Sequence, residues 1–211
     1  MNNSSDYKDD IFDNVHSCQK IFKALVMALA YPGTTQHLDT LDLVPIATDC
    51  CFALQPLIAL LDLETSHHVF SADTKLKQDI EQYLEINSSS SICQPEDADF
   101  ILCLDATARP FYHQLRRGTL SSPQLGTTMV YQVDSFNNPV QGIDSATFTL
   151  AGPGIKTPLT ITATGLDREE PALWHDSRQD YPLGVDLYLV SKTGEIMGIP
   201  RSVKILQSGV N

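Results

Sequence analysis

Two charged residues near the end of the chain, Asp186 and Arg201, could share one polar site. Asp186 follows Gly184 inside an otherwise apolar strand-like run, where a carboxylate must face water or find a partner. Arg201 follows Pro200 at the end of the next such run. If the chain reverses at residues 192–194, antiparallel pairing sets the two nearly opposite each other. We therefore predict a salt bridge or shared polar site, and the pattern leaves open whether it only pins the hairpin or also serves a function.

A glycine-containing turn could add backbone N–H groups to such a site. The segment 152–157 reads GPGIKT, which partly resembles the end of a phosphate-binding loop. In such a loop glycine, lysine and threonine follow one another directly, but here Ile155 separates them and Pro153 lacks an N–H donor. A tight turn between two strands is the favoured interpretation. The candidate phosphate site comprises Asp186, Arg201, Gly152 and Gly154.

Other signals for chemistry are weak. The chain has no H-E-x-x-H, no G-x-S-x-G and no C-x-x-C motif, and we predict no metal site. His67 and His68 are neighbours on a predicted strand, so they face opposite sides and are interpreted as surface or edge residues. Glu169 and Glu170 could be an acid–base pair, but a solvated acidic turn is favoured. Trp174 could stack a base, but core packing is the commoner use.

The predicted elements alternate in the first half of the chain and are mostly strands in the second. Helices are expected at 12–30, ended by Pro32-Gly33, at 48–61 with Thr48 or Asp49 as cap, and at 74–86 and 111–117. Strands are expected at 68–70, 99–104, 127–133, 146–150, 159–164, 185–190, 195–199 and 203–206, with a short helix at 171–176.

This order predicts a layered α/β sandwich with a mixed sheet and a β-rich C-terminal half. No linker or repeat divides the chain, so we expect a single α/β domain over residues 1–211, with 1–11 as a frayed acidic N-terminus.

The net charge of −12 over 211 residues argues against nucleic-acid binding, which rests on Lys and Arg displacing counterions. The acidity is uneven, however. Residues 1–105 hold 17 acidic residues and five lysines, whereas residues 106–211 hold nine acidic and nine basic residues, including all six arginines. Any anion contact is therefore expected in the second half. With no signal peptide and no apolar run of about 20 residues, a cytoplasmic protein without a membrane segment is predicted.

Four short motifs, taken in order, resemble the PhnH family. They are FKALVMALAYPG at 22–33, LAGPGI at 150–155, YPLGVDL at 181–187 and IPR at 199–201. The ordered set covers the chain from about residue 12 to residue 206. Within it, the residues expected to shape the backbone are Pro32, Gly33, Pro182, Gly184 and Pro200.

The resemblance implies the H subunit of the bacterial carbon–phosphorus lyase system for phosphonate breakdown. It implies a fold like that of pyridoxal-phosphate-dependent transferases but without the cofactor, and a place in a core complex with the G, I and J subunits. That system displaces adenine from ATP by a phosphonate and gives ribose 1-phosphonate 5-triphosphate. The resemblance carries over no catalytic residue, and a homodimer is expected for the isolated subunit.

Two hypotheses for the function follow. In the first, the chain is an accessory subunit that the complex requires but that is not catalytic alone, which predicts a sizeable exposed apolar patch. In the second, it is an independent nucleotide- or phosphonate-binding α/β enzyme with a phosphate pocket around Arg201.

Overall fold

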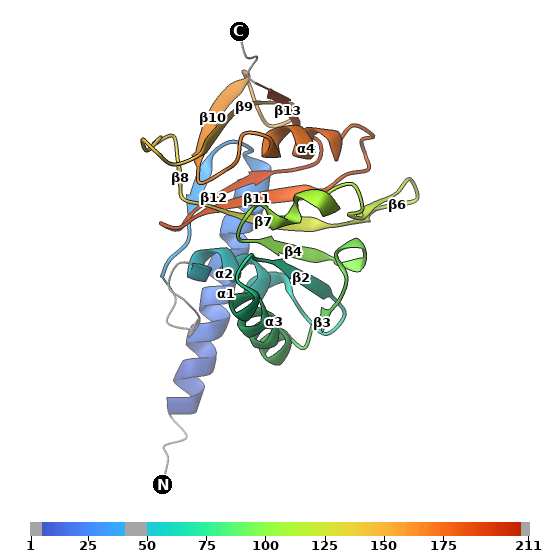
Figure 1. The fold of residues 1–211 in the computed structure, drawn as a ribbon. Helices are drawn as coiled ribbons and strands as arrows, with labels where there is room; N and C mark the ends of the chain where they lie inside the picture. The colour runs from blue at the N-terminus through green and yellow to red at the C-terminus, as the bar shows by residue number, and fades with distance from the viewer. Residues whose placement is uncertain (1–5, 41–49, 208–211) are drawn as a thin grey trace.

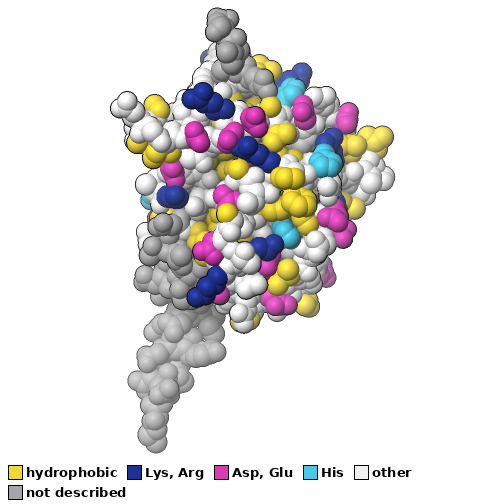
Figure 2. Space-filling model, viewed as in Figure 1, with side chains coloured by type: hydrophobic (Ala, Val, Ile, Leu, Met, Phe, Trp, Pro, Cys, Tyr) yellow, Lys and Arg dark blue, Asp and Glu magenta, His cyan; other side chains and the backbone are white. Residues whose placement is uncertain are grey.

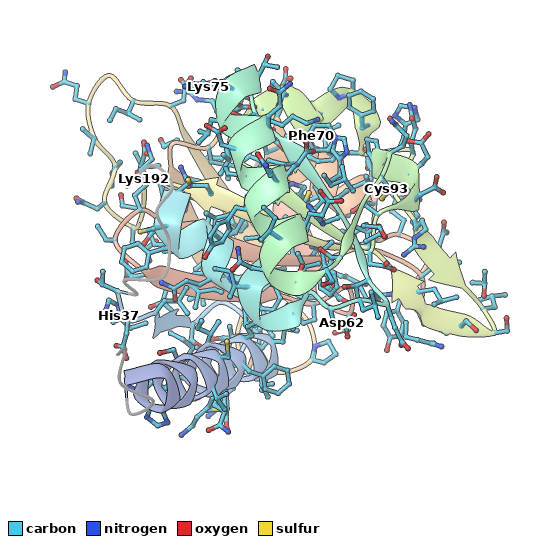
Figure 3. The ribbon with its side chains drawn as sticks, turned by 90° about the horizontal axis from the view of Figure 1, so that it is seen from below. His37, Asp62, Phe70, Lys75, Cys93 and Lys192 are labelled. Carbon is cyan, nitrogen blue, oxygen red and sulfur yellow. The ribbon has the colours of Figure 1, made fainter. Side chains whose placement is uncertain are left out.

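A seven-stranded sheet lies at the centre of the molecule, between a layer of helices and a second, smaller sheet (Figure 1). The computed structural model describes residues 6–40 and 50–207. The helix layer consists of α1 (Asp6–Ala30), α2 (Cys51–Leu60) and α3 (Thr74–Ser88). In a view from below, α1 runs along the lower edge of the picture and α2 and α3 lie nearer its middle (Figure 3). The predicted α/β fold with a mixed sheet and a β-rich C-terminal half is confirmed.

The central sheet combines parallel and antiparallel strands. In spatial order its strands are β1 (Thr35–His37), β12 (Glu195–Ile199), β11 (Asp186–Ser191), β7 (Thr128–Val133), β4 (Phe100–Cys103), β2 (Ser66–Phe70) and β3 (Ser91–Ile92). The five strands from β11 to β3 are parallel, whereas β12 is antiparallel to both of its neighbours. Leu187 pairs with Ile199, so the predicted reversal of the chain at residues 192–194 is confirmed.

Side-chain alternation along the central strands supplies two cores, one on each face. On β11, Leu187 and Leu189 join the core beneath the second sheet, while Tyr188 and Val190 join the core beneath the helices. Because both faces are covered, these strands read as continuous apolar runs. That is why β4, flanked by parallel strands on both sides, was predictable as a buried strand.

The second sheet covers the other face with four antiparallel strands. Their order is β13 (Lys204–Gln207), β9 (Ser145–Ala151), β10 (Leu159–Thr164) and β8 (Ser135–Phe136). Helix α4 (Glu170–Asp176) lies with this layer and buries Trp174 in edge-to-face contact with Tyr131 and Phe148, as core packing predicts. The remaining elements are the 3-10 helices η2 (Pro95–Asp97) and η3 (Ala106–Phe111) and the hairpin of β5 (Arg117–Thr119) and β6 (Ser122–Gly126).

Helix α1 lies unusually close to the central sheet at Gly198 of β12. A Cβ atom at this position would lie 2.6 Å from the carbonyl carbon of Ala28, which is a backbone atom that cannot move aside easily. The glycine therefore lets the helix pack directly against the strand.

Two of the expected helix boundaries are wrong. Helix α1 begins at Asp6 rather than at residue 12. The helix expected at 111–117 is replaced by η3, because the Asp105 side chain caps an earlier start by accepting from Thr107 N at 3.0 Å, and Arg117 already belongs to β5.

The expected boundaries of α2 are only partly covered by the described residues. The predicted cap residues Thr48 and Asp49 lie outside the described residues, and Cys50 occupies the N-cap position. Pro56 lies within α2 and does not end it.

Candidate anion site

The predicted pair of Asp186 and Arg201 is present. Asp186 opens β11 and Arg201 follows the end of β12, so the hairpin register sets them side by side. Asp186 Oδ1 accepts from the Arg201 backbone N–H at 2.7 Å, and Oδ2 accepts from Arg201 Nε at 3.0 Å and Nη2 at 2.5 Å. Such two-pronged contact between a guanidinium and a carboxylate is strong and directional.

All three side-chain nitrogens of Arg201 are engaged. Besides the two contacts to Asp186, Arg201 Nη1 donates to the carbonyl oxygen of Pro123 in β6. The side chain therefore ties the β11–β12 hairpin to the β5–β6 hairpin. Arg201 therefore has a structural role at the edge of the site, and the carboxylate of Asp186 balances its positive charge.

Gly184 allows a further segment to approach this pair. Its φ is +149°, and a Cβ atom there would lie 3.2 Å from Arg201 Cβ and 3.3 Å from the carbonyl oxygen of Ser177. The peptide bond before Pro182 is cis. The 181–187 motif thus brings residues 177–178 against Arg201.

The two candidate glycines of the 152–157 turn have different surroundings. Gly152 lies against the segment after Arg201, since a Cβ atom there would be 3.1 Å from the Ser202 carbonyl oxygen. Gly154 lies against Pro32, with 2.9 Å from its hypothetical Cβ to Pro32 Cδ. The segment forms the expected tight turn, closed by Ile155 N donating to the Gly152 carbonyl.

The four motifs therefore meet in space although they are far apart in sequence. The first motif contacts the second through Pro32 and Gly154, and a Cβ atom on Gly33 would lie 3.4 Å from Leu150. The second motif contacts the chain after the fourth through Gly152, and the third and fourth meet through Asp186 and Arg201. This convergence explains why the ordered set is more informative than any one motif.

A pocket of about 650 Å³ opens beside Arg201. It lies between the end of α4 and strand β13, and its lining includes Arg178, Arg201, His175 and Lys204. Arg201 lines the pocket and is held by Asp186, the first residue of β11. The pocket therefore lies toward the amino end of that strand.

Arg178 is the residue of this pocket that sequence reasoning missed. Its side chain is buried, and its Nε and Nη1 have no hydrogen-bond partner among the described residues. Burial lowers the pKa of Arg178 to about 10, Asp186 opposes that shift, and Arg201 adds to it. The sequence held no signal for this role, because Arg178 looks like any other arginine in a polar segment.

Glu170 forms a second polar cluster and corrects the prediction of a solvated acidic turn. Its side chain is fully buried and accepts from Arg109 Nε at 2.9 Å, Tyr112 OH at 2.6 Å and Tyr131 OH at 3.2 Å. Burial raises the pKa of Glu170, while the hydrogen bonds from Tyr112 and Arg109 work in the opposite direction. Its neighbour Glu169 is exposed, as predicted.

His67 and His68 do face opposite sides, but both are buried rather than at the surface. His67 Nδ1 lies 2.9 Å from Ser90 Oγ, and His68 Nδ1 lies 2.7 Å from the carbonyl oxygen of Cys93. Burial lowers the pKa of both imidazoles. Residues 90–93, which run beside β2, contact both rings, and this cover from a distant part of the chain accounts for the error.

Neither a metal cluster nor a membrane span is found in the described part of the chain. Within residues 6–40 and 50–207, no three side chains of His, Cys, Asp or Glu come together as metal ligands would. Over the same residues, no helix combines the length and the apolar character needed to cross a bilayer.

The fold and the site define an α/β protein of two stacked sheets with an arginine-bearing pocket beside its central hairpin. Residues 10–206 match the family described as bacterial phosphonate metabolism protein (PhnH), and the chain belongs to that family.

Two curated relatives agree with this assignment. One is the alpha-D-ribose 1-methylphosphonate 5-triphosphate synthase subunit PhnH of Rhizobium meliloti (strain 1021), 24% identical over 202 residues that cover 94% of this chain and 95% of the relative. The other is a Stutzerimonas stutzeri protein named as a C-P lyase subunit, HtxG, 28% identical over 201 residues that cover 92% of this chain and 88% of the relative.

Proposed function

We propose that this chain is a subunit of the carbon–phosphorus lyase system and supports the formation of ribose 1-phosphonate 5-triphosphate from ATP and an alkylphosphonate. The family match over residues 10–206 carries this proposal. Both relatives are named as subunits of such a system and align over most of their own length, so a role shared by the whole chain is the simplest inference.

An accessory role fits better than the alternative of an independent enzyme with a phosphate pocket around Arg201. That alternative needs a free guanidinium, but Asp186 and the Pro123 carbonyl already engage Arg201. We place the chain in the cytoplasm, where ATP is available, and propose the G, I and J subunits as its partners.

We propose a kinship to pyridoxal-phosphate-dependent transferases without the cofactor. The mixed seven-stranded sheet with helices on one face supports it (Figure 1).

An exposed apolar face of α1 supports assembly with other subunits. Val15, Phe22 and Val26 lie on one side of the helix, and each leaves about half of its surface exposed. Val15 and Phe22 border a shallow, mainly apolar hollow of about 450 Å³, whose other lining residues are Cys18, Gln19 and Ala59. Contiguous apolar surface of this kind is typical of a protein–protein contact. We expect the isolated chain to use exposed surface of this type in a homodimer.

Co-purification tests this role. The tagged full-length chain, co-expressed with the G, I and J subunits, is expected to retain them through affinity and size-exclusion steps. Phe22→Glu is expected to lower the retained amount at least about tenfold, because a charge must be desolvated in the contact. Leu120→Glu is the control, since Leu120 is also an exposed apolar residue but lies in the β5–β6 hairpin, and full retention is expected.

If the unmodified chain retains none of the three subunits, the proposed function is wrong. If both variants retain them equally, the subunit role stands but the α1 face is not the contact.

A further inference from the structure

The side chain of Arg178 is charged and buried, yet among the described residues no hydrogen-bond acceptor lies against its Nε or Nη1. Only 7% of the residue is exposed. Leaving a buried guanidinium unpaired is costly, so proteins retain one mainly where something else supplies the anion. We propose that Arg178 anchors a binding site for a ligand that carries a phosphate or phosphonate group.

The charge of the pocket fits an anion. None of the eleven lining residues is acidic, although the chain as a whole carries a net charge of −12. Figure 2 shows acidic side chains spread among basic ones over one face of the molecule, so their absence from the pocket is a local feature. The carboxylate of Asp186, which acts on Arg178 electrostatically, is held by Arg201 through both of its oxygens and cannot turn to Arg178 without breaking that pair.

The pocket also offers further donors around Arg178. Lys204 and His175 line it from β13 and from α4, and Ser202 adds a hydroxyl group from the turn that precedes β13. A tetrahedral oxyanion presents three or four acceptor oxygens, which a guanidinium fork and surrounding donors can match together.

The remaining walls indicate that the ligand is larger than an inorganic ion. Pro153 and Leu206 contribute apolar surface, and Tyr181 at the rim is largely exposed. A volume of about 650 Å³ is within the range of organic ligands. We infer a phosphorus-containing head group at Arg178, with the organic part of the ligand along the apolar wall.

Three sources share this head-group chemistry: a nucleoside triphosphate, an alkylphosphonate and inorganic phosphate. The choice of a phosphonate or of ATP rests on the proposed function, whereas the anion site itself rests on Arg178 and its pocket. Failure of the complex to assemble would therefore not remove the site, and failure of binding would not remove the subunit role.

The test measures binding and melting temperature on the full-length chain. Calorimetric titrations use ATP, methylphosphonate and inorganic phosphate in separate arms, and thermal unfolding is followed with and without each. At least one ligand is expected to bind and to raise the melting temperature. Arg178→Met is expected to weaken that binding about 100-fold, because the buried guanidinium that would hold the anion is lost.

The ligand-free variant separates binding from structure. Removing an unpaired buried charge while keeping a long side chain is expected to raise the melting temperature of the ligand-free chain by about 2–4 °C. Arg168→Met is the matched control, since Arg168 is exposed and outside the pocket, and it is expected to change neither quantity.

The proposal is overturned if none of the three ligands binds, or if Arg178→Met binds as tightly as the unmodified chain. A folded, ligand-free Arg178→Met that melts lower than the unmodified chain would show that the charge serves the fold, which also contradicts the proposal. If Arg178→Met does not fold, Arg178→Lys decides: a loss of binding of about tenfold is expected from the missing fork, and unchanged binding would overturn the proposal.

Discussion

Replacing Glu170 by alanine is expected to lower the free energy of unfolding by about 3–5 kcal/mol. The carboxylate is fully buried and accepts hydrogen bonds from Arg109, Tyr112 and Tyr131. Without it, two buried hydroxyl groups and one guanidinium N–H lose their acceptor. Each group then keeps the free-energy cost of leaving water without a hydrogen bond to offset it. Urea unfolding followed by circular dichroism measures the change.

Glu169→Ala is the control for this variant. Glu169 is the adjacent glutamate and also faces Arg109, but at 3.6 Å and with 79% of its side chain exposed. An exposed pair of this kind contributes little, so a change below about 1 kcal/mol is expected. Equal losses for the two variants would show that the buried cluster does not stabilise the fold as its geometry indicates.

Replacing Asp186 by alanine is expected to lower the free energy of unfolding by about 3–5 kcal/mol. Its carboxylate binds the backbone and side chain of Arg201, of which only 13% of the side chain is exposed. The loss would leave Arg201 with the Pro123 carbonyl alone and would remove the carboxylate that offsets the repulsion between Arg201 and Arg178. Arg201 would then lack its counter-charge beside a second guanidinium group.

Two further variants make this prediction specific. Asp180→Ala removes an exposed aspartate that lies 4.0 Å from Arg117, and a change below about 1 kcal/mol is expected. Combining Asp186→Ala with Arg201→Met should recover part of the loss, because the unpaired cation is removed together with its partner. If the double variant loses as much free energy of unfolding as the two single variants lose together, the two residues do not act as a pair.

The hairpin that holds Asp186 and Arg201 was predictable because the residues that specify it are neighbours in the sequence. Strong β-forming runs flank a Lys-Thr-Gly turn, and the period of two along each strand fixes which residues face each other. The structure pairs Leu187 with Ile199, which is the register that a turn centred on Thr193 requires. The salt bridge follows from that register.

The roles of Glu170 and Arg178 were not predictable because their burial arises from distant parts of the chain. The partners of Glu170 come from η3, the residue after it and β7, between 39 and 61 positions away. Nothing near Glu170 in the sequence distinguishes it from Glu169. Likewise, the pocket around Arg178 forms only when β13 and the turn after β9 lie beside it.

The helix predicted at residues 111–117 is absent for a reason that lies in the neighbouring sequence. The apolar spacing after Pro110 looked helical, but the Asp105 cap starts a 3-10 turn before it, and Arg117 and Gly118 are taken by the β5–β6 hairpin. A short element of this kind is decided by its cap and by the strand that follows, more than by its own periodicity.

The most direct test of the central claim, that this chain is a functional subunit of a carbon–phosphorus lyase system, is reconstitution. The G, I and J subunits are supplied with ATP and methylphosphonate, and ribose 1-methylphosphonate 5-triphosphate is measured by phosphorus NMR with and without this chain in place of the H subunit. Product is expected to form at an increased rate only when the chain is present. An unchanged rate of product formation in its presence and in its absence would contradict the claim.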